Sequence, residues 1–204
     1  MKESLPNKTD SIFKDEVNPD YGAWLKNPAN KFFLYSEGYK EAGKKLWEFC
    51  IKNRFYANTL IYPLVFNYRQ FLELRLKELI IMGYKYLDTE KDFSDEHSLI
   101  RLWNTYRNEI LPQIEQIEKD ILDNVERIIS QFNSEDPQSM TFRYPVTRGP
   151  NRKDSLNRET IDLNNFKNVI DKLIYFFDWQ WDMISQFEDM KAEMIADMYR
   201  QYWH

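Results

Sequence analysis

Glycine, cysteine and histidine are all scarce in this sequence. The 204 residues include 5 Gly, 1 Cys and 2 His. So few glycines allow few tight turns, which favours helices over a sheet of many strands. The lone Cys50 has no partner for an internal disulfide, which fits a reducing compartment. Its apolar neighbours Trp47, Phe49 and Ile51 predict a small buried side chain rather than a nucleophile.

Long apolar runs and the common ligand-binding motifs are missing as well. The N-terminus lacks the apolar stretch of a signal peptide, and no run approaches the roughly 20 residues of a membrane helix. We therefore expect a cytoplasmic protein that does not contact the membrane. GxGxxG, GxxxxGK[ST] and GxSxG are absent, which argues against dinucleotide, P-loop and serine-hydrolase sites. One cysteine and two histidines offer no zinc-ligand pairs, so we expect no metal and no cofactor.

Apolar and aromatic residues are plentiful by comparison. They make up 43% and 16% of the chain, enough for a well-packed core. The net charge of −5 disfavours general binding to nucleic acid, which depends on clustered Lys and Arg. A local basic patch remains compatible with this charge.

Apolar residues that recur at three- and four-residue intervals predict an all-α bundle of about five helices. Residues 1–30 mix several prolines with alternating charges and are expected to form a loose N-terminal arm. Residues 31–188 are expected to form the helical bundle domain, and residues 189–204 a C-terminal helical extension.

Local signals predict where the helices begin and end. Gly83 is the expected stop of the second helix, and Ser94 or Asp95 is the expected cap of the third. Pro112 marks a break or a new first turn after the third helix, and Asp162 is expected to cap the last one. The expected helices span about 29–52, 56–83, 97–110, 114–132 and 162 onward.

The segment at residues 61–80, IYPLVFNYRQFLELRLKELI, is expected to be the central helix, because apolar residues cover more than half of its circumference. Arg69 and Glu73 project from this surface four residues apart, within pairing distance of each other. Unpaired charges there would be strongly destabilising, so both need partners, which His97 or a basic segment further on can supply. Two interpretations stay open: a structural salt-bridge cluster, or a functional site in which His97 transfers protons.

Residues 140–158, MTFRYPVTRGPNRKDSLNR, differ in composition from the rest of the chain. Five basic residues stand against Asp154 alone, and proline, glycine and an alternating start predict a small β-hairpin or an extended insertion. The candidate binding residues here are Arg143, Tyr144, Arg148 and Arg152. They have two open interpretations: contacts to the phosphates and bases of single-stranded RNA, or pairing with acidic helices of the protein itself.

The C-terminal part of the chain predicts one long helix. It has no glycine or proline from residue 162 onward, so an unbroken helix there would exceed the diameter of a small domain. Its end carries Met194, Ile195, Met198, Tyr202 and Trp203. Adaptable methionines beside aromatic residues suit docking onto a protein partner or self-association. The alternative is that the end folds back onto the core.

Two segments, YRQFLELRLKELI and the HSLIRLW that follows it, resemble the central helix and the following His-Ser/Asp-Leu segment of HEPN-type helical bundles. The later FRYP and IDLNNF also resemble bacterial relatives of that type, so the likeness covers about 62–103 and 141–177. Such bundles occur in many bacterial defence, toxin–antitoxin and RNA-processing proteins. Their catalytic members use an Arg-x4–6-His motif, which is absent here, since three residues separate Arg200 from His204.

The resemblance implies a non-catalytic HEPN-like module that binds a protein or RNA partner in bacterial defence or stress response. One alternative is a metal-independent RNase in which His97 acts as acid or base while Arg69 and Arg143 hold phosphate. Another is a structural subunit that assembles a larger complex through its C-terminal helix.

Overall fold

The computed structural model describes residues 5–13, 18–25, 31–93 and 95–202, and its chain forms two compact units, Met1–Lys31 and Phe32–His204. In the first unit, the described residues form turns and irregular backbone. Their hydrogen bonds are local, as where the Asn7 backbone N–H donates to the Asp10 carboxylate at 2.7 Å. The rest of the predicted arm lies outside the described residues.

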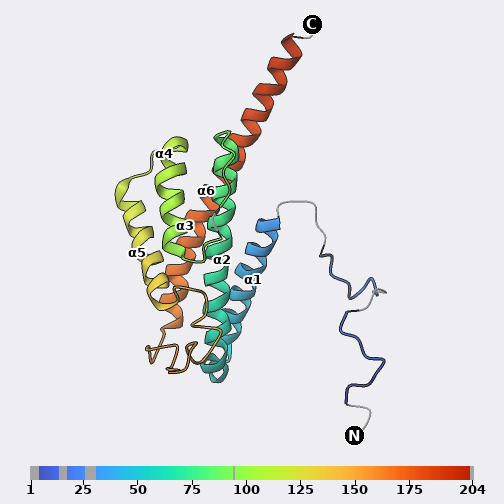
Figure 1. The fold of residues 1–204 in the computed structure, drawn as a ribbon, viewed down its shortest axis with the longest axis vertical. Coiled ribbons are helices and arrows are strands. Elements are labelled where there is room, and N and C mark those ends of the chain that lie inside the picture. Colours follow the sequence, from blue (N-terminus) through green and yellow to red (C-terminus); the bar gives the residue numbers. More distant parts are fainter. Residues whose placement is uncertain (1–4, 14–17, 26–30, 94, 203–204) are drawn as a thin grey trace. The chain divides into compact units, whose positions relative to one another are not determined.

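Over the described residues, the fold is all-α with five helices, as predicted from the sequence (Figure 1). The third helix runs without a gap through α3, a π-helical turn η3 and α4, and a short 3-10 turn η2 precedes α2. The elements are α1 Lys31–Lys52, η2 Arg54–Tyr56, α2 Ala57–Tyr86, α3 Leu99–Thr105, η3 Tyr106–Ile110, α4 Leu111–Ile114, α5 Lys119–Glu135 and α6 Leu163–Tyr202.

Helix α2 runs through the middle of the second unit, and residues on several sides of it are buried (Figure 1). It packs against α6, α3 and η3, and its Tyr68 ring closely approaches Gly43 of α1. Pro63 lies within its second turn, where the Asn67 side-chain amide donates to the Pro63 carbonyl at 2.6 Å. A helix surrounded in this way explains why apolar residues cover so much of its circumference.

The predicted stop at Gly83 is wrong, because α2 continues to Tyr86. Gly83 instead permits a close helix contact: a Cβ added there would lie 2.3 Å from Cγ2 of Ile110 in η3. The absence of a side chain at this position lets the third helix pack directly against the α2 backbone.

The third helix begins at Leu99, and its predicted cap at Asp95 is also wrong; the alternative, Ser94, lies outside the described residues. Ser98 occupies the N-cap position, but its hydroxyl donates to the Asn133 side chain at 2.9 Å. Glu96 accepts the backbone N–H groups just before the helix, from His97 at 3.1 Å and from Ser98 at 3.0 Å. The Glu96 side chain bends back to reach these two N–H groups. The usual capping residues, Ser, Thr, Asp and Asn, have shorter side chains.

Of the two options for Pro112, a break or a new first turn, the structure shows the second, and the break itself follows a few residues later. Pro112 sits in the first turn of α4, directly after the π-helical turn η3, and the chain leaves the helix at residues 115–118. Proline removes one backbone donor and crowds the preceding helical turn. The turn that Pro112 crowds is the π-helical turn η3, which is wider than an α-helical turn. The helix can therefore continue through the proline.

The loop between α5 and α6 contains the predicted extended insertion. Val146 and Asp154 form an isolated antiparallel bridge. Beside it, the Thr147 N–H donates to the Lys153 carbonyl at 2.8 Å, and the Ser155 N–H donates to the Pro145 carbonyl at 2.9 Å. These contacts close a short hairpin-like loop without extending into a ladder.

Helix α6 has 40 residues and projects beyond the other helices of its unit (Figure 1). Asp162 caps its start as predicted, accepting the backbone N–H of Asn165 at 3.0 Å. The last ties to the bundle lie at Lys191, whose Nζ contacts the Tyr86 carbonyl at 2.7 Å and the Asp88 carboxylate at 2.6 Å. Residues 192–201 are exposed, so the end of the helix does not fold back onto the core. No helix in the described ranges is long and apolar enough to cross a membrane.

Two glycine substitutions test the close contact between α2 and η3. Gly83→Ala should lower the free energy of unfolding by about 1–3 kcal/mol, because the new methyl group overlaps Ile110. Gly38→Ala, at a helical position with nothing within 4 Å of the added Cβ, should instead raise it by about 0.5–1 kcal/mol. Urea unfolding measures both changes. Equal stabilisation by the two alanines would contradict the contact, and Ile110→Ala should shrink the cost of Gly83→Ala.

Candidate functional site

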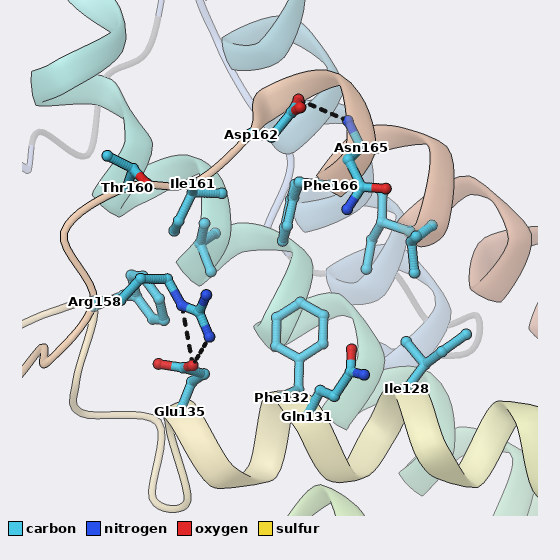
Figure 2. Close-up of a pocket in the computed structure, with 14 residues that line it drawn as sticks. Ile128, Gln131, Phe132, Glu135, Arg158, Thr160, Ile161, Asp162, Asn165 and Phe166 are labelled. Carbon is cyan, nitrogen blue, oxygen red and sulfur yellow. Dashed lines mark hydrogen bonds and ion pairs between the residues drawn. The ribbon is translucent and has the colours of Figure 1, made fainter.

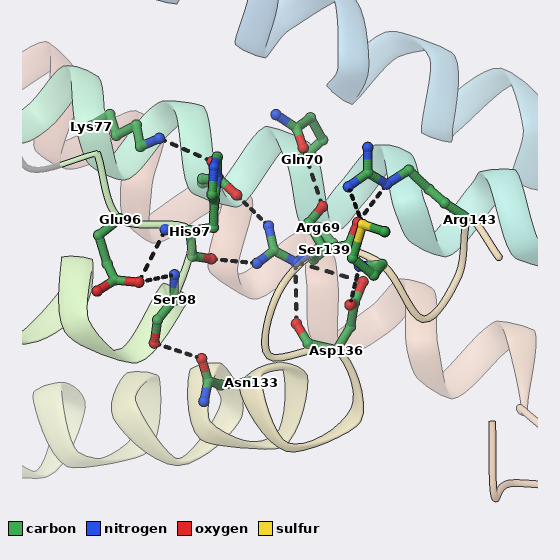
Figure 3. Close-up of polar contacts among 12 residues, drawn as sticks. Arg69, Gln70, Lys77, Glu96, His97, Ser98, Asn133, Asp136, Ser139 and Arg143 are labelled. Atoms are coloured by element: carbon green, nitrogen blue, oxygen red, sulfur yellow. Dashed lines mark hydrogen bonds and ion pairs between the residues drawn. The ribbon is translucent and has the colours of Figure 1, made fainter. Parts of the chain in front are cut away.

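Arg69 and Glu73 lie one turn apart on α2, and 0% and 2% of their side chains are exposed. The Arg69 Nη1 donates to the Glu73 carboxylate at 2.5 Å. Figure 3 shows the Arg69 guanidinium pointing into the space between α2, the start of α3 and the end of α5. Further polar groups surround both residues, as buried charges require.

The Glu73 carboxylate has three partners. Besides Arg69, it accepts from Lys77 Nζ at 3.0 Å and lies 2.8 Å from His97 Nδ1. Burial raises the pKa of this carboxyl, but the hydrogen bonds with His97 and Arg69 outweigh burial, and the resulting pKa is lower than usual. Glu73 is therefore ionised at neutral pH and balances the buried guanidinium.

His97 is held at two points. Its ring contacts Glu73, and its backbone carbonyl accepts from Arg69 Nη2 at 2.5 Å. Its side chain nevertheless remains 65% exposed. A carboxylate on one ring nitrogen fixes the orientation of an imidazole, an arrangement that also occurs in catalytic and metal-binding sites.

Arg69 also contacts the residue that follows α5. Its Nε lies 3.4 Å from the Asp136 backbone carbonyl and 3.7 Å from the Asp136 carboxylate. The Asp136 carboxylate in turn accepts the backbone N–H groups of Met140 at 2.6 Å and Thr141 at 2.9 Å. Arg69 thus joins α2 to the segment before α3 and to the turn after α5. Asp136 was not a sequence candidate; its only signal was its place in the turn SEDPQS.

The candidate residues of the basic segment lie apart from this cluster, on the loop between α5 and α6. Arg143 Nε donates to the Ser139 carbonyl at 2.5 Å. Its guanidinium lies 5.4 Å from the centre of the Phe66 ring and 6.0 Å from that of Tyr144. Arg143 therefore fixes the start of the loop against α2 and does not meet Arg69 or His97.

Arg148 and Arg152 are exposed and line a hollow of about 540 Å³ on the same loop. Within the described part of the chain, neither arginine forms an ion pair. Tyr144 borders this hollow and is 50% exposed. The basic loop therefore presents two arginines without counter-ions beside an aromatic side chain.

The geometry gives the cluster around Glu73 a structural role first. Arg69 is fully buried and its guanidinium is engaged by Glu73, His97 and Asp136, so it has no face open to a phosphate. The exposed His97 ring is the one group of the cluster that can exchange a proton with a ligand in solvent. The described residues contain no group of three or more His, Cys, Asp or Glu placed to hold a metal ion.

A second buried ion cluster on α2 includes none of the sequence candidates. Arg75, 1% exposed, pairs with Glu78 at 2.9 Å, with Asp178 of α6 at 3.3 Å and with Glu37 of α1. Its guanidinium also lies 5.9 Å from the centre of the Trp181 ring. The sequence held a usable signal, because Arg75 and Glu78 sit in the same apolar run as Arg69 and Glu73.

A third feature is an apolar hollow of about 350 Å³ between α5 and the start of α6 (Figure 2). Phe132 and Phe166 form part of its wall. At its edge Arg158 pairs with Glu135, and the Asp162 carboxylate caps α6. The charged groups beside this hollow are therefore already partnered.

Comparison with known proteins finds no matching family model, no matching curated protein and no matching solved structure. The HEPN resemblance of the sequence stays a prediction. The all-helical architecture of the described residues rests on the structure itself.

Glu73→Gln should destabilise the protein by about 3–5 kcal/mol at pH 7, because it leaves the buried Arg69 without its counter-charge. The pKa of Glu73 is lower in the folded chain than in the unfolded chain, so its carboxylate stabilises the fold above about pH 5. This stabilisation is lost as the pH falls through the folded pKa. The difference between wild type and variant, measured by urea unfolding, should therefore shrink in acid.

The matched control is Glu90→Gln, which makes the same chemical change at an exposed position. It should shift the free energy of unfolding by less than about 0.5 kcal/mol at every pH. A Glu73→Gln cost that stays constant from neutral to acidic pH would contradict the ion-pair explanation.

Proposed function

We propose that this protein is a non-catalytic binding module that docks onto a partner protein through the exposed end of α6. The observation that carries the proposal is a stripe of largely exposed apolar side chains on the end of α6. The HEPN-like character, with a role in bacterial defence or stress response, belongs to the same proposal and rests on the segments at 62–103 and 141–177.

The apolar stripe repeats every four residues. Met190, Met194 and Met198 are 59%, 66% and 57% exposed, and Ile195 and Tyr199 beside them are 44% and 65% exposed. Residues four apart lie on one face of a helix, so these side chains form a continuous apolar surface. Such a surface fits the helix-in-groove mode of recognition, in which flexible methionines adapt to the partner.

An acidic stripe runs beside the apolar one. Asp189, Glu193 and Asp197 repeat at the same four-residue interval, one position ahead of the methionines. Arg200 pairs with Asp197 at 2.9 Å, whereas Asp189 and Glu193 have no ion pair among the described residues. The complementary partner is an apolar groove with a basic edge, and the acidic stripe disfavours RNA as the ligand of this surface.

The enzyme alternative is favoured by one observation, the contact between Glu73 and the exposed His97 ring. The two arginines that this alternative assigns to phosphate binding are poorly placed for that role. Arg69 is fully buried, and Arg143 is engaged by Ser139 and two aromatic rings. We therefore rank phosphodiester cleavage below binding.

Purified protein should leave labelled single-stranded RNA intact, because Arg69 is fully buried and Arg143 is engaged by Ser139, so neither arginine of the enzyme alternative is free to hold phosphate beside His97. Gel analysis of the RNA tests this, with His97→Ala as the diagnostic variant and Glu90→Gln as the control for contaminating nucleases. Cleavage that vanishes in His97→Ala, with thermal unfolding unchanged, would establish the enzyme instead.

A photo-crosslinking amino acid at position 194 should produce a discrete protein adduct in cells that express the protein, because Met194 lies at the centre of the apolar stripe. Arg200 is exposed on the side of the same helix that carries none of the stripe residues, so the same amino acid there should produce little adduct. Mass spectrometry identifies the adduct. Equal adducts at the two positions, none at either, or RNA in place of protein would contradict the proposal.

A further inference from the structure

We infer that the partner of the α6 extension is a second copy of this chain, which receives it in the basic groove on the loop between α5 and α6. Here the extension means residues 189–202, and the basic groove means the two adjoining hollows lined mainly by the loop between α5 and α6. The inference rests on the proposed function, because it names the occupant of the same apolar stripe.

The basic groove is large enough for several side chains. Its two hollows have volumes of about 500 and 540 Å³ and share Thr141, Tyr144, Pro145 and Ser155 as walls. Volumes of this size are typical of pockets that enclose ligands. The two hollows therefore adjoin each other along the loop.

The chemistry of the groove matches that of the extension. Apolar surface comes from Met140, Phe142, Val146 and Leu156, and the cations from Arg143, Arg148 and Arg152. The methionine stripe fits the apolar surface, and Asp189 and Glu193 supply carboxylates for Arg148 and Arg152. Within the described residues of one chain, none of these four charged side chains forms an ion pair.

The apolar hollow of Figure 2 does not offer the same match. Its Arg158 is already paired with Glu135, and its Asp162 caps α6. An acidic helix entering there would meet no free cation and one additional carboxylate. Charge thus favours the basic groove, where Arg148 and Arg152 outnumber the exposed Asp154, over the apolar hollow.

A chain cannot fill its own basic groove. The groove lies on the loop that leads into Leu163, whereas the extension begins at Asp189, roughly 40 Å further along one unbroken helix at about 1.5 Å per residue (Figure 1). Groove and extension are different surfaces, so their contact is heterologous. Repeating it generates an open chain of molecules, or a ring if the rotation closes.

Two full-length variants with complementary defects test this arrangement. The extension variant, Met194→Glu with Met198→Glu, keeps the groove; the groove variant, Arg148→Glu with Arg152→Glu, keeps the extension. All four positions are exposed, so both variants should fold as the wild type does, which circular dichroism and thermal unfolding check. Analytical ultracentrifugation then measures mass against concentration.

Wild type should exceed the monomer mass of 24.9 kDa as concentration rises, and each variant alone should remain at that mass. A mixture of the two variants should form a complex of about twice the monomer mass, because the groove variant supplies the extension and the extension variant supplies the groove. Lys153→Glu, a loop charge reversal outside the groove lining, should assemble like the wild type. High salt should weaken assembly.

Two results would overturn the inference. If the groove variant self-associates alone, the extensions pair with each other; if wild type stays monomeric at every concentration, the partner is another protein. In the second case the crosslink at position 194 still decides the proposed function, since an adduct with a different protein supports it and the absence of any adduct contradicts it.

Discussion

The buried guanidinium of Arg69 constrains how the helices around α2 are arranged. It is fully removed from water and bonds Glu73 on its own helix, the His97 carbonyl before α3 and the Asp136 carbonyl after α5. A shift of any of these segments would leave a buried charge short of a partner, and that is strongly destabilising. Arg75 imposes a similar constraint on the other side of α2, through Glu37 of α1 and Asp178 of α6.

Because of this constraint, the primary role of Arg69 and Glu73 is structural. Arg69 and Glu73 are occupied in holding the fold, so a reaction that displaced either from its partners would also weaken the helix packing. His97 is the exposed edge of the cluster, with its ring in contact with Glu73. The proposed recognition surfaces lie elsewhere, on the extension of α6 and on the basic loop, where Asp189, Glu193, Arg148 and Arg152 form no ion pair within the described residues.

The sequence predicted what depends on local spacing and missed what depends on contacts across the fold. Periodicity located the helices, and the position of Arg69 and Glu73 in an apolar run showed that they need partners. The sequence pattern did not identify Asp136, which lies 67 residues from Arg69, or Asp178, which lies 103 residues from Arg75. Gly83 was misinterpreted for the same reason, because its role is set by Ile110 on another helix and not by its neighbours in sequence.

The stiffness of α6 determines how its end can recognise a partner. The helix runs from its Asp162 cap without glycine or proline, and Lys85 with Glu188, and Lys191 with Asp88, fasten it to the end of α2. The methionine stripe therefore begins at a fixed position on a preformed helix. Docking such a helix loses less conformational entropy than ordering a flexible tail would. A rigid extension of this kind also sets the spacing and rotation between bound molecules, so a head-to-tail contact through it would have one defined geometry.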